Sequence, residues 1–214
     1  MTIFYNLDFA GFFAASQKGK TTLWHKIYDG VDKSKFYILD TNDEYADYPN
    51  RTKVGTYDTT SATLDKFIRT SREDYSKHVV FEDIEAFDPQ NSKELDVYAI
   101  NGMHQNIGCT VISRRILGLN KKLLLNMRYF FLGWGLISND IEYLLADNLQ
   151  LTAPHRSNIG SGPDWLVLDG ERVDGGQPIT TAQAWELYLH VQPFQFLYHD
   201  RITRETYIFA LPPP

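Results

Sequence analysis

A run of nine residues near the start of the chain has the side chains and the spacing needed to bind phosphate. The segment Ala14-Ala15-Ser16-Gln17-Lys18-Gly19-Lys20-Thr21-Thr22 fits the pattern GxxxxGK[ST] at every fixed position except the first, where alanine replaces glycine. In such a loop, backbone N–H groups and the positive end of the following helix dipole cradle phosphate oxygens. Lys20 would reach the β- and γ-phosphates, and the Thr21 hydroxyl would ligate Mg²⁺. The expected ATP-binding residues are therefore Ser16, Gln17, Lys18, Gly19, Lys20, Thr21 and Thr22.

The residues on either side of this loop should form a strand and a helix, which is the context that the pattern requires. Residues 7–15 are apolar apart from Asp8 and rich in phenylalanine, as a buried strand should be. Residues 22–28 can wind into a helix. A first position that needed a positive φ would favour glycine over Ala14.

A second apolar segment ends in two adjacent carboxylates. Residues 77–81 have the composition of a strand and are followed by Glu82 and Asp83. Beside a phosphate-binding loop, one such carboxylate holds the Mg²⁺ shell and the other polarises the attacking water. The usual order is Asp then Glu, so by position Glu82 takes the magnesium role with Thr21, and Asp83 takes the water-activating role. Glu85 is an alternative base.

Two arginines follow the next predicted strand, residues 108–113. A cationic group at the tip of this strand could contact the γ-phosphate and report its hydrolysis to the rest of the protein. Arg114 or Arg115 could instead act on the nucleotide of a neighbouring subunit, as an arginine finger does. We therefore include both arginines among the candidate catalytic residues, together with Lys20, Glu82 and Asp83.

The pattern of strands and helices predicts an α/β fold with a mostly parallel central sheet flanked by helices. Residues 1–152 should form this core. Residues 153–214 should form a loop-rich appendage on the same domain, with a long loop at 155–176 around a short strand at 165–168, a helix at 180–190, and a hairpin of strands 194–199 and 206–211. The remaining predicted strands are 35–40 and 129–134, and the remaining predicted helices are 63–74, 92–103, 119–126 and 140–146.

Composition limits the class of protein and of partner. The chain has 214 residues, of which 43% are hydrophobic, which suits one domain with a substantial core. Its single cysteine, Cys109, lies in an apolar run and should fill the core. We expect no signal peptide and no membrane-spanning segment. The net charge of −6 argues against a uniformly nucleic-acid-binding surface.

One segment of this acidic chain carries basic residues and no acidic ones. Residues 97–139 contain no Asp or Glu, which suggests a partner that is negative at one place: DNA phosphates, a neighbour's nucleotide or an acidic surface. A solvated basic face is the alternative. The cations of this segment are Arg114, Arg115, Lys121, Lys122 and Arg128.

The order of these motifs resembles that of the FtsK–HerA superfamily of P-loop ATPases, and most of all the genome-packaging ATPases of tailless, membrane-containing viruses. The resemblance covers residues 9–145. Arg114 stands where that family usually has Gln, and Met103 where Arg is frequent. The segments that carry it are SQKGKTT at 16–22, ILDTNDEY at 38–45, VVFEDIEAF at 79–87, GMHQNIGCTVISRR at 102–115, NMRYFFLGW at 126–134 and SNDIEYL at 138–144.

The resemblance implies a RecA-like fold and a hexameric or pentameric ring that hydrolyses ATP with Mg²⁺ and threads double-stranded DNA through its pore. It also implies a place in the host cytoplasm or at the virion packaging vertex, next to a capsid vertex or viral membrane protein. Lys121 and Lys122 are the expected DNA contacts, since they lie in the loop and helix that follow the predicted strand 108–113.

Two other functions remain open from the residues alone. One is a small-molecule or nucleotide kinase, but such enzymes usually carry an arginine-rich lid, and the 155–176 loop has only Arg156 and Arg172. The other is an assembly factor that binds ATP with little turnover.

Overall fold

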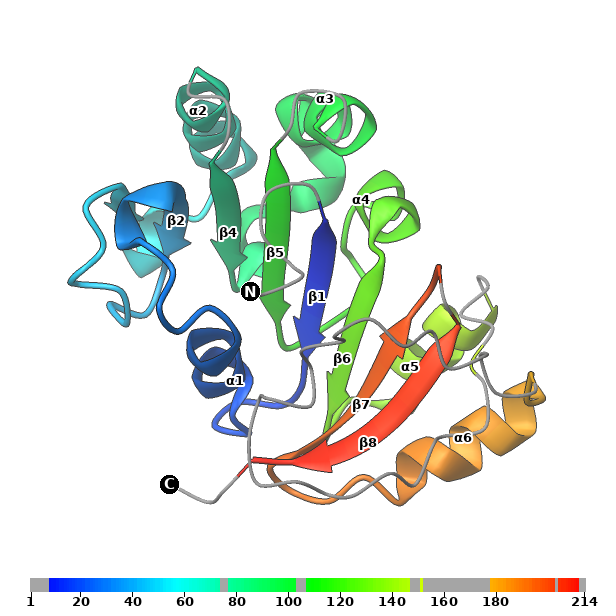
Figure 1. The fold of residues 1–214 in the computed structure, drawn as a ribbon. Coiled ribbons are helices and arrows are strands. Elements are labelled where there is room, and N and C mark those ends of the chain that lie inside the picture. The colour runs from blue at the N-terminus through cyan, green and yellow to red at the C-terminus, as the bar shows by residue number, and fades with distance from the viewer. Residues whose placement is uncertain are drawn as a thin grey trace.

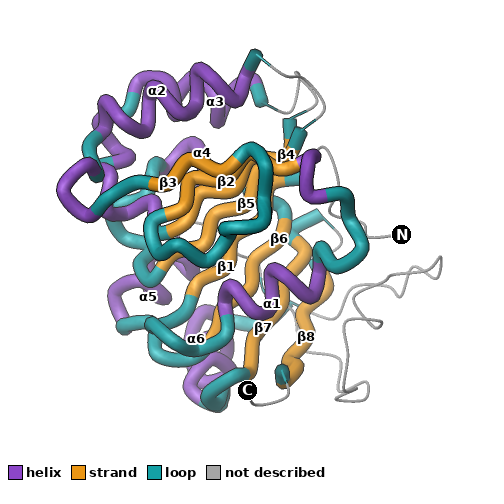
Figure 2. The backbone as a smooth tube through the Cα atoms, turned by 90° about the vertical axis from the view of Figure 1, so that its left-hand side faces the viewer, coloured by secondary structure: helices purple, strands orange, loops and turns teal. Residues whose placement is uncertain are grey.

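Eight strands form one sheet in the computed structural model, which describes residues 8–73, 77–102, 107–146, 151, 178–202 and 204–211 (Figure 1). The order across the sheet is β3-β2-β4-β5-β1-β6-β7-β8, so β3 and β8 are its edges (Figure 2). The strands are β1 Phe9–Phe13, β2 Phe36–Asp40, β3 Arg51–Lys53, β4 His78–Glu82, β5 Gly108–Ser113, β6 Tyr129–Gly133, β7 Gln195–Asp200 and β8 Glu205–Ala210.

The first six strands are parallel, which confirms the predicted α/β class. β1 lies at the centre, between β5 and β6, with Phe12 opposite Ile112 on one side and Phe131 on the other. β7 then pairs antiparallel with β6, and β8 antiparallel with β7, so the predicted hairpin near the C-terminus extends the same sheet. The loop at 155–176 and the short strand at 165–168 lie outside the described residues.

Both faces of the sheet are covered, which explains why the central strand β1 is apolar at every position rather than at alternate ones. In β1, Phe9 and Phe13 pack into one hydrophobic cluster, while Ala10 and Phe12 pack into the other. Helix α1 covers the second cluster and the other helices contribute to the first. The helices are α1 Lys20–Ile27, α2 Ser61–Arg72, α3 Lys93–Asn101, α4 Lys121–Asn126, α5 Ser138–Ala146 and α6 Thr181–Leu189.

The structure describes several features that bear on expectations drawn from the sequence. Cys109 is buried in the sheet, as predicted. Within the described residues, no helix combines the length and the apolarity needed to cross a bilayer. The sequence did not predict β3, because three polar or charged residues at a sheet edge have no hydrophobic pattern. Helix α1 begins at Lys20 rather than at residue 22, so the phosphate-binding motif runs into its first turn.

A buried histidine makes the stability of this sheet sensitive to acid. His78 begins β4; its Nε2 atom lies 2.7 Å from Thr110 Oγ1, and its ring packs against Tyr28 and Phe36. Burial lowers the pKa of His78 to about 3. The histidine therefore stays neutral in the folded protein, while in the unfolded chain it takes up a proton as the pH falls below its ordinary pKa of about 6.5.

We expect the free energy of unfolding to fall by roughly 2 kcal/mol through His78 alone between pH 7 and pH 5, because the unfolded state then binds more protons. Urea unfolding at the two pH values measures this. The variant His78→Gln keeps a polar side chain next to Thr110 but does not titrate, so its pH dependence should be smaller by that amount. An equal pH dependence in both proteins would contradict the prediction.

Candidate nucleotide-binding site

The predicted phosphate-binding loop connects the end of β1 to the start of α1 at the centre of the sheet. Its first residues are anchored to both neighbouring strands: the N–H of Ala14 donates to the carbonyl of Ser113, and the N–H of Ala15 to the carbonyl of Trp134. Gly19 precedes the helix in the left-handed conformation, with φ of 89°. The first turn of α1 has no acidic residue and no side-chain cap, so no side chain competes with an anion for its backbone N–H groups.

Alanine is accommodated at the first position of the motif by its neighbour in the sheet. Ala14 is not among the residues with positive φ, so its conformation does not require glycine. The facing residue on β6 is Gly133, and a Cβ atom there would lie 2.7 Å from the Cβ of Ala14. The methyl group that the motif gains at residue 14 therefore fills space that residue 133 leaves free.

Lys20 holds its ammonium group inside the curve of the loop. The Nζ atom donates to the carbonyls of Ala14 at 3.0 Å and Ala15 at 3.2 Å. Burial lowers the pKa of Lys20, and the nearby carboxylates of Asp83 and Glu85 partly oppose this effect. A desolvated ammonium held by weak carbonyl acceptors is well placed to exchange them for phosphate oxygens.

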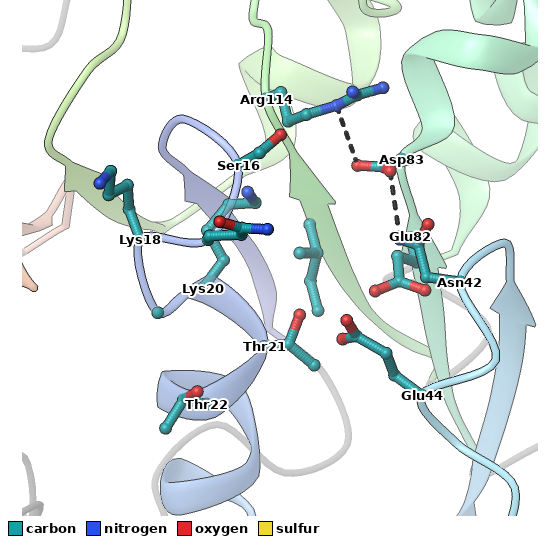
Figure 3. A pocket seen from close by; sticks show the side chains of 13 residues that line it. Ser16, Lys18, Lys20, Thr21, Thr22, Asn42, Glu44, Glu82, Asp83 and Arg114 are labelled. Carbon is teal, nitrogen blue, oxygen red and sulfur yellow. Dashed lines mark hydrogen bonds and ion pairs between the residues drawn. The ribbon is translucent and has the colours of Figure 1, made fainter. Parts of the chain in front are cut away.

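Three oxygen-bearing side chains converge next to Lys20: Thr21 from α1, Glu82 from the end of β4, and Glu44 from the loop after β2 (Figure 3). Glu82 is almost fully buried, and no described residue forms a hydrogen bond with its Oε2 atom. Burial, and then repulsion from Glu44, Asp40 and Asp83, raise the pKa of Glu82 to about 8.

This donor set fits Mg²⁺. A hard divalent cation prefers carboxylate and hydroxyl oxygens, and it would relieve the repulsion on Glu82. Among the described residues, no group of three or more His, Cys, Asp or Glu side chains could hold a metal by itself. A nucleotide-linked Mg²⁺ is usually held by one or two protein ligands together with phosphates and water, so Thr21 and Glu82 would be enough to hold it.

Asp83 occupies a different environment from Glu82. Its backbone is left-handed, with φ of 45°, and its carboxylate accepts a hydrogen bond from Asn42 Nδ2 at 3.2 Å. Arg114 Nε lies 3.6 Å from the other Asp83 oxygen (Figure 3). Glu85, the alternative base, instead accepts hydrogen bonds from Ser113 Oγ and from the backbone N–H of Arg114. Glu85 therefore fixes the tip of β5 and positions Arg114.

The loop and these side chains enclose an open pocket of about 310 Å³. All seven nucleotide-binding residues predicted from the motif line it, together with Glu82, Asp83 and Arg114. Asn42 and Glu44 were not predicted as site residues, although they belong to the segment that follows β2, whose end lies at the same edge of the sheet as the loop. The full lining is Ser16, Gln17, Lys18, Gly19, Lys20, Thr21, Thr22, Asn42, Glu44, Glu82, Asp83, Ile112 and Arg114.

Arg115 does not line the pocket. Its Nε atom lies 2.8 Å from Asp140, which is fully buried and also accepts the N–H groups of Ile116 and Leu117. The structure thus separates the two adjacent arginines: Arg114 faces the nucleotide site and Arg115 ties the loop after β5 to α5. Lys121 and Lys122 also lie outside the pocket, at the exposed start of α4.

The cations of the acid-free segment are less available in space than in the sequence. The fold brings carboxylates from other segments next to most of them, so the segment is not a continuous basic surface. The ion pairs join Arg114 to Glu85, Arg115 to Asp140, Lys122 to Asp96 and Arg128 to Asp200.

No protein-family model and no curated protein sequence matches the chain. Similarity is found in the structure. The genome packaging NTPase B204 from Sulfolobus turreted icosahedral virus 2, in complex with AMPPCP, has a TM-score of 0.67 at 11% identity, covering 97% of this chain and 98% of B204. The DNA-packaging ATPase B204 from Sulfolobus Turreted Icosahedral Virus has a TM-score of 0.68 at 11% identity, covering 98% of this chain and 100% of B204.

This chain has the fold of the packaging ATPase B204. The resemblance drawn from the order of its motifs is therefore confirmed for the fold. ATPases 2 and 3 of EssC from Geobacillus thermodenitrificans share the fold more loosely, with a TM-score of 0.53 at 12% identity. The match covers 95% of this chain and 39% of the EssC chain.

Proposed function

We propose that this chain is a Mg²⁺-dependent ATPase that drives double-stranded DNA into a viral capsid. The observation that carries the proposal is the convergence of Lys20, Thr21 and Glu82 in one pocket at the end of β1. The structural likeness to packaging ATPases supports the DNA-moving role. We also propose that the chain forms a homo-oligomeric ring, a hexamer or pentamer, and that it works in the host cytoplasm or at the virion packaging vertex beside a capsid vertex or viral membrane protein.

The residues of the pocket suggest how hydrolysis would proceed. The loop N–H groups and Lys20 bind the phosphates and stabilise the negative charge that develops on the transferred group. Thr21 and Glu82 would hold Mg²⁺, which supplies further charge neutralisation when it is bound. Asp83, held by Asn42, orients the attacking water. Arg114 contacts both Asp83 and Glu85, so its position can respond to the state of the γ-phosphate.

A DNA-stimulated ATPase assay tests the proposal. With Mg·ATP, a DNA motor hydrolyses faster when double-stranded DNA is added. A rate that depends on a phosphate acceptor but not on DNA would indicate a kinase instead. ATP binding without turnover, with or without DNA, would indicate the assembly factor.

Lys121 and Lys122 remain our proposed DNA contacts. Because Lys122 forms an ion pair with Asp96, one variant should weaken DNA binding and another should strengthen it. Replacing both lysines with alanine should weaken binding to every DNA sequence and flatten its salt dependence, because phosphate contacts are sequence-independent. Asp96→Asn should strengthen DNA binding, because it removes the carboxylate that competes with phosphate for Lys122. Fluorescence anisotropy across a salt titration measures both effects.

Two controls keep this test specific. Lys35→Ala removes an exposed lysine that precedes β2, away from α4, and should leave DNA affinity unchanged. Hydrolysis without DNA is recorded for each variant, since its loss would indicate damage to the nucleotide site. If DNA affinity were unchanged in the double lysine variant, Lys121 and Lys122 would belong to a solvated basic face and not to a DNA-binding surface.

A further inference from the structure

Three apolar residues lie beside the phosphate-binding loop on the side away from the carboxylates. We call this group the apolar ledge and define it as Trp134, which is exposed, Phe194, which is partly buried, and Leu211, which is buried. These residues follow β6, precede β7 and follow β8, so all three lie at the edge of the sheet where β1 ends. The ledge therefore adjoins the end of the loop opposite to Glu82, Asp83 and Arg114.

Trp134 is joined directly to the loop. Its carbonyl accepts the N–H of Ala15 at 3.1 Å, and the ammonium of Lys18, a loop residue, lies 4.8 Å from the centre of its indole ring. The residue is 39% exposed. Several large apolar side chains are exposed in the described part of the chain, but Trp134 is the one whose backbone is bonded to the loop.

Phe194 and Leu211 reach the start of α1 from behind the loop. A Cβ atom on Gly19 would lie 3.1 Å from Leu211 Cδ1 and 3.4 Å from Phe194 Cδ1. The N–H of Leu211 donates to the carbonyl of Phe194 at 2.8 Å, which holds the two together. The last residue before the helix is thus backed by apolar side chains from the C-terminal hairpin.

The backbone of Phe194 is held in an uncommon conformation. Its φ is 62°, in the left-handed region that a bulky aromatic residue rarely adopts. Such outliers persist only where the surrounding structure enforces them, and they are frequent at ligand sites. Here the conformation directs an aromatic ring toward Gly19 while leaving part of that ring exposed.

The direction of a bound nucleotide follows from the two ends of the loop. The γ-phosphate must lie near Lys20, Glu82 and Asp83, where hydrolysis takes place. The sugar and base then leave the loop on the opposite side, where β6 replaces β5 as the neighbour of β1. At that side the described structure offers an exposed indole ring, whose π-face is the kind of surface on which a nucleobase stacks.

We infer that the apolar ledge is the base-binding part of the nucleotide site, with the purine stacked on Trp134 and with Phe194 and Leu211 backing Gly19 at the start of α1. Stacking would displace the Lys18 ammonium from the indole face. This inference rests on the proposed function, since it takes the loop to bind a nucleoside triphosphate. It also gives the C-terminal hairpin a share in ATP binding.

The test separates base binding from phosphate binding by comparing ATP with inorganic tripolyphosphate. Calorimetry would measure both ligands, with Mg²⁺, on the parental protein and on Trp134→Ala, Trp134→Phe and Leu189→Ala. We expect Trp134→Ala to weaken ATP binding by about tenfold or more and to leave tripolyphosphate affinity unchanged. Trp134→Phe should keep most of the affinity, because it retains an aromatic face. Leu189→Ala removes an exposed apolar side chain on α6 and should change neither ligand.

Tryptophan emission provides a second readout that does not depend on the alanine variant folding. The chain has four tryptophans, and ATP but not tripolyphosphate should quench the emission of Trp134. The quenching should therefore be lost in Trp134→Phe. Equal loss of ATP and tripolyphosphate affinity in Trp134→Ala, or unchanged quenching in Trp134→Phe, would overturn the inference. Failure of the parental protein to bind either ligand would instead refute the proposed function.

Discussion

Replacing Lys20 with alanine is expected to abolish ATP hydrolysis while the fold remains intact. The Lys20 ammonium is buried inside the loop and held by two backbone carbonyls, so its charge is available to phosphate oxygens in a poorly solvated site. Removing one such stabilising group from an active site usually costs a factor of about 10²–10³ in kcat. Steady-state hydrolysis and a thermal melt, measured on the same preparation, check both parts of the prediction.

The matched control for this variant is Lys35→Ala. Lys35 is an exposed lysine that lies after the same helix, outside the pocket. Hydrolysis should continue at the parental rate in this control. Parental turnover in Lys20→Ala would show that the loop does not serve ATP hydrolysis, and the proposed function would then fail at its first step.

The second large effect distinguishes the two adjacent carboxylates at the end of β4. Asp83→Asn should retain Mg·ATP binding and lose turnover by a factor of about 10²–10⁴, because water activation is removed while the cation site survives. Glu82→Gln should weaken binding of ATP in a Mg²⁺-dependent way, because Glu82 carries the buried oxygen next to Thr21 and Glu44. Titrations of nucleotide with and without Mg²⁺, together with turnover numbers, measure both effects.

Two further variants make this comparison sharper. Asp88, like Asp83, has a left-handed backbone, but its carboxylate is exposed. The variant Asp88→Asn should therefore change neither nucleotide affinity nor turnover. Glu44→Gln probes the third carboxylate of the pocket. If Asp83→Asn turned over ATP normally while Glu44→Gln did not, Glu44 would be the base. The opposite result is that Asp83→Asn loses Mg²⁺-dependent binding and Glu82→Gln loses only turnover. In that case the aspartate would hold Mg²⁺ and the glutamate would activate water, as in the usual order, although their positions in the chain are exchanged.

The parts of the site that were predictable depend on local patterns. The spacing of Gly19, Lys20 and Thr21 forms a phosphate-binding turn through backbone geometry alone, and an apolar strand followed by Glu82 and Asp83 places carboxylates at a strand end. Because parallel strands end at the same edge of a sheet, those two motifs had to meet once the α/β class was recognised. The alternation of predicted strands and helices along the sequence indicated the α/β class.

The remaining features depend on which segments the fold brings together. Asn42 and Glu44 entered the pocket because β2 ends at the same edge of the sheet as β1. Gly133 makes Ala14 acceptable through a contact between residues far apart in the sequence. The short polar strand β3 had no hydrophobic period to reveal it.

The chain by itself determined which residues can bind phosphate and hold a cation, since those properties come from residue type and near-neighbour spacing. The tertiary structure alone decided which charges are free to act. Arg114 faces the pocket, while Arg115, the next residue, is held by buried Asp140, and Lys122 is paired with Asp96. The physical reason is that a charge interacts with whatever lies within a few ångströms, and those neighbours come from other strands and helices.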